Sequence, residues 1–238
     1  MFKSLNFKVI LFGFIFTFFS SFGQSFFLGL FNSSIRDALS ITHGQFGSIY
    51  ASATLLSSFI LVWIGKKIDD INILKFASYV VVLLAISCFL FSKITSVIFL
   101  FFSIFLMRLS GQGLMSHTAT TTIARFFEKS RGRALSITWL GLSLAEFILP
   151  ILIIFLLTFL DWRNIWISTS IFIILILPLV SFLLVRNIKL DSRETSSIKE
   201  IKKKEIKQWK RNEVLKDYRF YIICLSMLAM PSIATGTF

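Results

Sequence analysis

Six long apolar segments follow one another along this chain, separated by short polar connections. They cover approximately residues 9–31, 45–64, 74–92, 96–122, 134–160 and 163–185. Each is long enough for an α-helix to cross a bilayer, which needs about 20 apolar residues. Only 16% of the residues are charged, against roughly 25% in an average soluble domain, and the mean hydropathy is +0.81. The sequence therefore predicts an all-α integral membrane protein.

The chain divides into three predicted parts. Residues 1–185 form the predicted six-span unit, residues 186–217 a very basic linker, and residues 218–238 the start of a seventh span. The N-terminus, with Lys3 and Lys8 before an apolar run, could also be read as a signal peptide. Because that run continues through Phe31, we expect an uncleaved first span.

The basic residues orient the chain across the membrane. With the N-terminus in the cytoplasm, nine Lys or Arg residues before position 186 lie inside and three lie outside. The outside residues are Arg36, Lys93 and Arg163. Cytoplasmic loops carry the excess of positive charge, so we expect a multi-pass protein of the cell (inner) membrane. The net charge of +13 is thereby explained by the lipid bilayer as partner, and no nucleic acid is required.

The linker permits two interpretations. Ile198, Ile201, Ile206 and Trp209 are spaced loosely like one face of a helix, with lysines between them. A basic amphipathic helix on anionic headgroups fits this pattern. A solvated, partly disordered connection fits it equally well.

Two segments suggest an inverted three-plus-three repeat, a common arrangement in secondary transporters. Ser21-Phe22-Gly23-Gln24-Ser25 in span 1 resembles Ser110-Gly111-Gln112-Gly113 in span 4, and the sequence ALSIT occurs at 38–42 and again at 134–138. A glutamine is costly in lipid, so we expect Gln24 and Gln112 to face a cavity or another helix. Interhelical hydrogen bonding without a substrate role is the alternative.

One arginine lies deep inside a span. Arg108 is about twelve residues from the outer end of span 4, roughly 18 Å in, where its insertion costs about 2.5–3.5 kcal/mol. Glu146 in span 5 is the candidate counter-charge and a candidate for proton coupling. Either the two form a structural ion pair, or Arg108 is free to bind an anionic substrate. His117 could join a proton path or serve only in helix packing.

Other chemistries find little support in the sequence. Cys88 and Cys224 lie far apart in apolar segments, with neither disulfide nor metal spacing. A membrane-embedded enzyme would need His, Asp or Cys clustered at one depth. We therefore expect no enzyme, no metal and no cofactor. A polytopic receptor or regulatory protein of seven spans is an alternative of another class.

Four places in the chain resemble the major facilitator superfamily of transporters. Gly65-Lys66-Lys67-Ile68-Asp69 looks like the family's G-x-x-x-D loop signature, and Arg108-x-x-Gly111-Gln112-Gly113 like its span-4 motif. Arg131-Gly132-Arg133-Ala134 looks like its loop between spans 4 and 5. The stretch from Gly141 through Glu146 to Pro150, followed by Asp161-Trp162-Arg163, resembles span 5 and its exit.

The chain also departs from the family pattern. Asp70 replaces a basic residue, Ala145 stands where a second span-5 glycine is frequent, and Asn72 stands where the signature has a glycine. Asparagine tolerates the left-handed backbone, so the tight turn can survive. The resemblance covers essentially all 238 residues but only one half of a two-half family. We therefore expect a truncated chain, with the missing C-terminal six-span half as its partner; a self-associating half-transporter is the alternative.

The resemblance implies a six-helix half-bundle with a partial seventh span, working by alternating access. Arg108, Gln112 and Gln24 would bind a small-molecule substrate. Glu146 and His117 would couple protons, and Gly65, Asp69, Arg131, Gly132 and Arg133 would gate the cytoplasmic side. A central arginine favours a small, monocarboxylate-like organic anion carried by symport or exchange. Export of neutral or lipophilic compounds is the alternative, if Glu146 neutralises Arg108.

Overall fold

The computed structural model describes residues 4–127, 129–186 and 211–236, and the regular elements within them are helices, without a β-strand. Residues 1–190 and 191–238 form two separate units. The second unit contains α10 (Arg211–Val214) and the apolar helix α11 (Tyr218–Gly236). The linker residues 187–210, and with them our two interpretations of the linker, lie outside the described residues.

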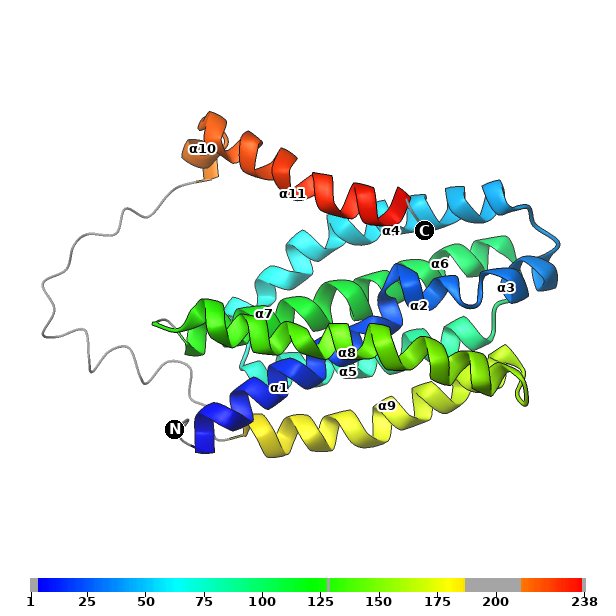
Figure 1. Cartoon of the computed structure of the whole chain (residues 1–238), viewed down its shortest axis with the longest axis horizontal. Coiled ribbons are helices and arrows are strands. Elements are labelled where there is room, and N and C mark those ends of the chain that lie inside the picture. Colours follow the sequence, from blue (N-terminus) through cyan, green and yellow to red (C-terminus); the bar gives the residue numbers. More distant parts are fainter. Residues whose placement is uncertain (1–3, 128, 187–210, 237–238) are drawn as a thin grey trace, which may run out of the picture. The chain divides into compact units, whose positions relative to one another are not determined.

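The first unit contains six helical stretches long and apolar enough to cross a membrane, as the sequence predicted. Figure 1 shows them as a bundle of long helices. Their elements, in chain order, are α1 (Ser4–Ser20), η1 (Ser21–Gly23) and α2 (Ser25–Gly29); α4 (His43–Lys66) and η2 (Lys67–Asp69); α5 (Ile73–Ser92); α6 (Val97–Met107), η3 (Arg108–Met115) and α7 (Ser116–Phe126); α8 (Arg131–Leu157); and α9 (Trp162–Val185).

Spans 1 and 4 are not the continuous helices that the apolar runs predicted. Span 1 is interrupted by the 3-10 turn η1 and by extended backbone at Gln24, with φ −80° and ψ 155°. Span 4 passes through the π-helical segment η3. Both irregularities include the glycine–glutamine pairs of the suggested repeat, Gly23-Gln24 and Gly111-Gln112. Irregular backbone at this depth is tolerated where protein or a cavity surrounds it.

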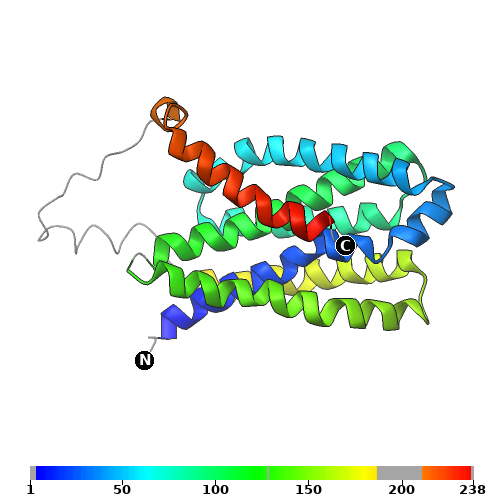
Figure 2. The same cartoon turned by 45° about the horizontal axis from the view of Figure 1, so that its top comes forward.

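The helix pairs obey the expected inverted repeat. α1 of span 1 packs on α8 of span 5, while α6 and η3 of span 4 pack on α4 of span 2. α5 of span 3 packs on α9 of span 6. Exchanging the first three spans with the last three turns the first pair into the second and leaves the third unchanged. Figures 1 and 2 show α1 crossing α8 in both views.

Polar side chains begin several helices. Thr42 and Gln45 form a reciprocal capping box at α4, and Ser96 and Asp161 each accept from a backbone N–H at the start of α6 and α9. Such caps satisfy N–H groups that the first helical turn leaves open. Asn72 caps α5 in the same way, with Oδ1 2.9 Å from the Leu74 nitrogen.

Two expectations about the connections need correction. Asn72 has φ −54°, so the left-handed backbone that asparagine tolerates is not used here; its capping bond explains its presence instead. The connection between spans 1 and 2 is also more than a polar joint, because Asn32–Leu39 forms the helix α3. Ile35 of α3 is buried, and Ser40, with φ 53°, ends the helix in the left-handed conformation.

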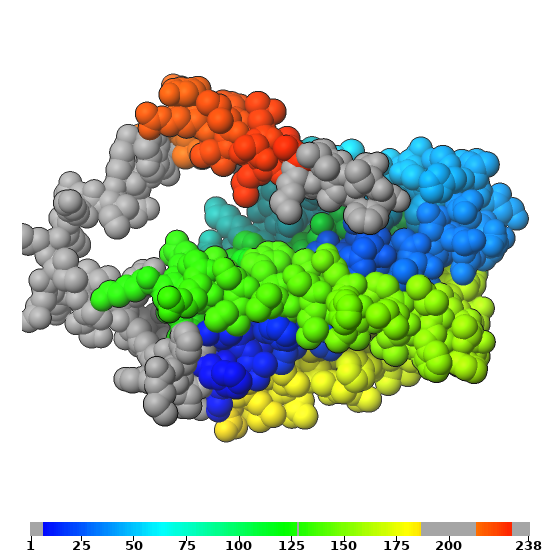
Figure 3. Space-filling model, in the orientation of Figure 1, coloured from blue at the N-terminus to red at the C-terminus, as the bar shows by residue number. Residues whose placement is uncertain are grey.

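The contact between α1 and α8 depends on small residues. A Cβ atom at Gly141 would collide with the backbone carbonyl of Phe14, and one at Gly13 would lie 2.9 Å from the Thr138 side chain. Thr17 donates to the Thr138 carbonyl at 2.6 Å. Small residues let membrane helices approach this closely. In Figure 3, α8 forms a ridge over the front of this unit, with parts of α1 and α9 visible below it.

Candidate functional site

The two interrupted spans touch at their irregular segments. A Cβ atom at Gly23 would collide with backbone atoms of Met107 and Gln112, and one at Gly111 would lie only 2.6 Å from the Gly23 nitrogen. Backbone therefore meets backbone at this crossing, with no room for a side chain on either glycine. The sequence repeat thus marks two segments that meet in space.

Arg108 is the first residue of η3 and lies at this crossing. Its side chain is 8% exposed. Nη1 donates to the Gly23 carbonyl oxygen at 3.0 Å, and the guanidinium carbon lies 5.3 Å from the centre of the Tyr50 ring. The buried Nε has no hydrogen-bond partner among the described residues. The guanidinium is therefore held by a carbonyl at the interruption of span 1 and by an aromatic ring of span 2. At least one of its N–H donors, Nε, remains unpaired among the described residues.

No carboxylate compensates this charge in the part of the chain that the structure describes. The ion pair found there joins Asp69 and Arg125, on other elements. Glu146 is exposed on α8 and forms no ion pair with Arg108. Spans 4 and 5 are neighbours, as we expected, where α7 packs on α8, but beside η3 it is α1 that packs on both η3 and α8. The helix beside η3 is therefore α1, and Arg108 and Glu146 form no ion pair.

Gln24 and Gln112 flank the same crossing. Both side chains are half-buried, and neither amide forms a hydrogen bond with another described residue. Gln24 stands at the interruption of span 1, where the backbone is extended. The structure therefore places Gln24, Arg108 and Gln112 at one crossing, and the two glutamine amides are unpaired among the described residues.

Two further residues at this site escaped the sequence analysis. Tyr50 and Thr54 lie one turn apart on α4, which packs against η3. The Tyr50 hydroxyl and the Thr54 hydroxyl are both shielded from solvent, and neither forms a hydrogen bond with another described residue. Ser25 is a neighbour of Tyr50. In the sequence, these two residues could have been recognised as polar side chains one helical turn apart within an apolar run.

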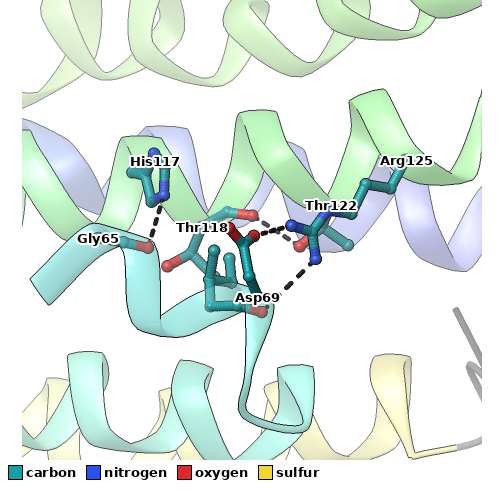
Figure 4. Close-up of polar contacts among 7 residues, drawn as sticks. Gly65, Asp69, His117, Thr118, Thr122 and Arg125 are labelled. Atoms are coloured by element: carbon teal, nitrogen blue, oxygen red, sulfur yellow. Dashed lines mark hydrogen bonds and ion pairs between the residues drawn. The ribbon is translucent and has the colours of Figure 1, made fainter. Parts of the chain in front are cut away.

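The other polar cluster lies at the Lys66 end of α4, where α4 and η2 meet α7 (Figure 4). His117 Nε2 lies 3.0 Å from the Gly65 carbonyl oxygen, so Nε2 carries the hydrogen. Arg125 forms an ion pair with Asp69 and reaches toward the Ile68 carbonyl at 3.5 Å. The side chains of this ion pair are 40% and 50% exposed.

The predicted gating residues are thus only partly brought together. Gly65 and Asp69 contact α7 through His117 and Arg125, and Arg125 was not among the predicted gating residues. Arg131 donates to the Ala124 carbonyl at 3.1 Å. Arg131 and Arg133 form no ion pair with another described residue, and a side chain at Gly132 would meet open space.

Comparison with known proteins gives one match. The family model described as Major Facilitator Superfamily matches residues 13–238. Neither a curated protein nor a solved structure matches the chain. The family match includes all the segments on which the resemblance was based, from the loop at Gly65 to the exit of span 5.

Proposed function

The chain belongs to the major facilitator superfamily, and from this premise we propose that it carries a small organic anion by alternating access, coupled to protons or to exchange. Transport itself follows from the family; the anion and the coupling are our proposal. The substrate would bind where spans 1, 2 and 4 meet, at Arg108, Gln112 and Gln24.

The observation that carries this proposal is the uncompensated charge of Arg108. A buried charge is stable only when it is paired or solvated, and the protein supplies the guanidinium with one carbonyl and one aromatic face. A carboxylate would provide the missing negative charge and accept from the unused donors. The planar guanidinium suits a carboxylate because both groups are flat and can form two parallel hydrogen bonds.

The same observation disfavours export of neutral compounds. That alternative required Glu146 to neutralise Arg108, and the two form no ion pair. A neutral substrate would leave the positive charge of Arg108 uncompensated. Its binding would also remove water from the charged guanidinium, which costs free energy. We therefore retain the anion as the proposed substrate.

Glu146 is our candidate for proton coupling. Apart from Asp69 at the end of its span, it is the only carboxylate in the six apolar spans. It is exposed on α8, next to Ala145, which is buried. A carboxylate on a packed span can bind a proton in one conformation and release it in another. His117 would assist through Nδ1, since its Nε2 is engaged with Gly65.

Replacing Glu146 tests this coupling. In proteoliposomes that contain the full-length gene product, Glu146→Gln should abolish accumulation driven by a pH gradient, because the amide cannot exchange a proton. Exchange of labelled for unlabelled substrate should continue at a rate close to wild type. Ser143→Ala, an exposed position on the same helix, is the control and should accumulate normally. Undiminished pH-driven accumulation by Glu146→Gln would remove Glu146 from the mechanism.

The ion pair between Asp69 and Arg125 gives a second test, of gating. We propose that it holds η2, at the end of span 2, and α7 together as the carrier changes conformation. Asp69→Arg and Arg125→Asp should each slow exchange several-fold, by placing like charges opposite each other, and the double variant should recover most of the rate. Because the pair is half-exposed, its loss should lower the free energy of unfolding by no more than about 1 kcal/mol.

Asp70 provides the control for this experiment. It is an exposed carboxylate next to Asp69, without an ion pair to another described residue, so Asp70→Asn should leave exchange unchanged. If the double variant were as slow as the worse single variant, the attraction between the two charges would not be what matters.

A further inference from the structure

Two hydroxyl groups on α4 differ from the other hydroxyls of that helix. Four serines of α4 each donate to a carbonyl oxygen of their own helix, at 2.8 to 3.0 Å; they are Ser48, Ser52, Ser57 and Ser58. The hydroxyls of Tyr50 and Thr54 are shielded from solvent and make no such bond. Leaving a buried polar group unpaired costs about 1–3 kcal/mol, so a ligand group that paired with these two would gain that free energy.

Both residues lie next to the proposed anion site. The Tyr50 ring lies under the Arg108 guanidinium at 5.3 Å. Thr54 is eleven residues from the start of α4, and Arg108 is eleven residues from the start of α6. At 1.5 Å per residue, both positions are roughly 16 Å along their spans. α4 packs against η3, and the bonds from Gly65 to His117 and from Asp69 to Arg125 show that the two spans run in the same direction.

We propose that Tyr50 and Thr54 recognise a hydroxyl group of the substrate, so that the transported anion is a small hydroxycarboxylate rather than a plain alkyl carboxylate. This inference rests on the proposed function, because Arg108 must hold the carboxylate. A hydroxyl can both donate and accept, so a substrate hydroxyl can bond to the side chain of either residue. A substrate without that group leaves the two side chains buried and unpaired.

The charges at the site distinguish a hydroxy acid from an amino acid. An α-ammonium group would lie beside the guanidinium of Arg108 and would need a carboxylate of the protein. In the described part of the chain the ion pair lies at the Lys66 end of α4, and Glu146 contacts neither Arg108 nor a basic partner. Like charges a few ångströms apart repel each other strongly away from water. A neutral hydroxyl avoids that repulsion.

The test compares acids that differ by one hydroxyl, namely lactate with propionate and glycolate with acetate. Uptake is measured in proteoliposomes with the full-length gene product. The wild type should prefer the hydroxy acid of each pair by at least about 10-fold in kcat/KM, since a site built to bond a hydroxyl rejects the analogue that lacks it. Thr54→Val and Tyr50→Phe should each reduce this preference several-fold, by slowing only the hydroxy acid.

Both substitutions remove a hydroxyl group and nearly preserve the shape of the side chain. Valine replaces the threonine hydroxyl by a methyl group, and phenylalanine retains the ring under Arg108. Ser58→Ala is the matched control, because that hydroxyl lies one turn along the same helix and is bonded to the Thr54 carbonyl; it should leave the preference unchanged. Circular dichroism and the elution profile in detergent show that the variants are folded.

The possible results distinguish failure of the hydroxyl subsite from failure of the anion site. If the wild type carries both acids of a pair equally, and Arg108→Lys weakens both, the hydroxyl subsite is overturned while the anion site survives. If the preference is present but unchanged in both variants, recognition by Tyr50 and Thr54 is overturned. If carboxylates are not transported, or are transported without need of Arg108, the proposed function fails together with the subsite.

Discussion

Arg108→Ala should reduce kcat/KM for carboxylate uptake by at least about 30-fold. Truncating one partner of a buried, hydrogen-bonded charge pair costs about 2–5 kcal/mol, and every 1.4 kcal/mol is a factor of ten. The variant also leaves the Gly23 carbonyl without the donor that it now has at 3.0 Å. The measurement is initial uptake of radiolabelled carboxylate into proteoliposomes, per amount of folded protein.

A lysine at this position separates binding from folding. Arg108→Lys keeps the positive charge and can still donate to Gly23, but it loses the planar fork. We expect it to fold like wild type and to transport about 10-fold less well. Arg36→Gln is the control, because Arg36 lies on α3 and bonds to Asn32 of the same helix. Wild-type carboxylate uptake by Arg108→Ala would end the anion-site proposal.

The crossing of the two interrupted spans should tolerate no side chain. Gly111→Ala and Gly23→Ala each place a methyl group against backbone of the other span, and backbone cannot move aside as a flexible side chain can. Overpacking of a tight core costs about 1–3 kcal/mol, and we expect the upper part of that range here. The helices would have to separate, which would also displace Arg108 from the Gly23 carbonyl. Uptake should fall to the background of empty vesicles.

Gly29→Ala is the control for these glycine variants. Gly29 lies on α2 of the same span, and a Cβ atom there meets open space. Alanine is favoured over glycine within a helix by about 1 kcal/mol, so Gly29→Ala should be neutral or slightly stabilising. Thermal unfolding in detergent provides the comparison. If Gly111→Ala unfolded at the wild-type temperature and transported normally, the close contact between the spans would not exist in the membrane.

The six spans and the importance of Arg108 could be predicted from the sequence, because polar and charged groups are costly in lipid. A charge in an apolar run is conspicuous for the same reason. The matching Gly23-Gln24 and Gly111-Gln112 pairs also indicated where regular helix would be lost. These features are local, so one chain without its fold is enough to find them.

The partners at the site could not be predicted from the sequence, since they depend on which helices are neighbours. Glu146 was the obvious counter-charge for Arg108 by depth, but α1 packs on both η3 and α8, and Gly13 and Gly141 allow its close approach to α8. Placing Tyr50 and Thr54 in a membrane helix costs little free energy, so neither residue is conspicuous in the sequence. Arg125 was one of many basic residues expected at the same membrane face, and only the fold distinguishes it as the partner of Asp69.

The π-helical segment η3 also sets the rotation of the rest of span 4. A π-bulge corresponds to an extra residue within an α-helix, and one residue in an α-helix turns everything after it by about 100°. His117 and Arg125 both follow η3, and they face α4 and the adjoining η2. Deleting a single residue within η3, such as Leu109, would restore regular α-helix and turn both side chains away from α4. The register of the contacts at the Lys66 end of α4 is therefore encoded in the length of the segment that holds Arg108.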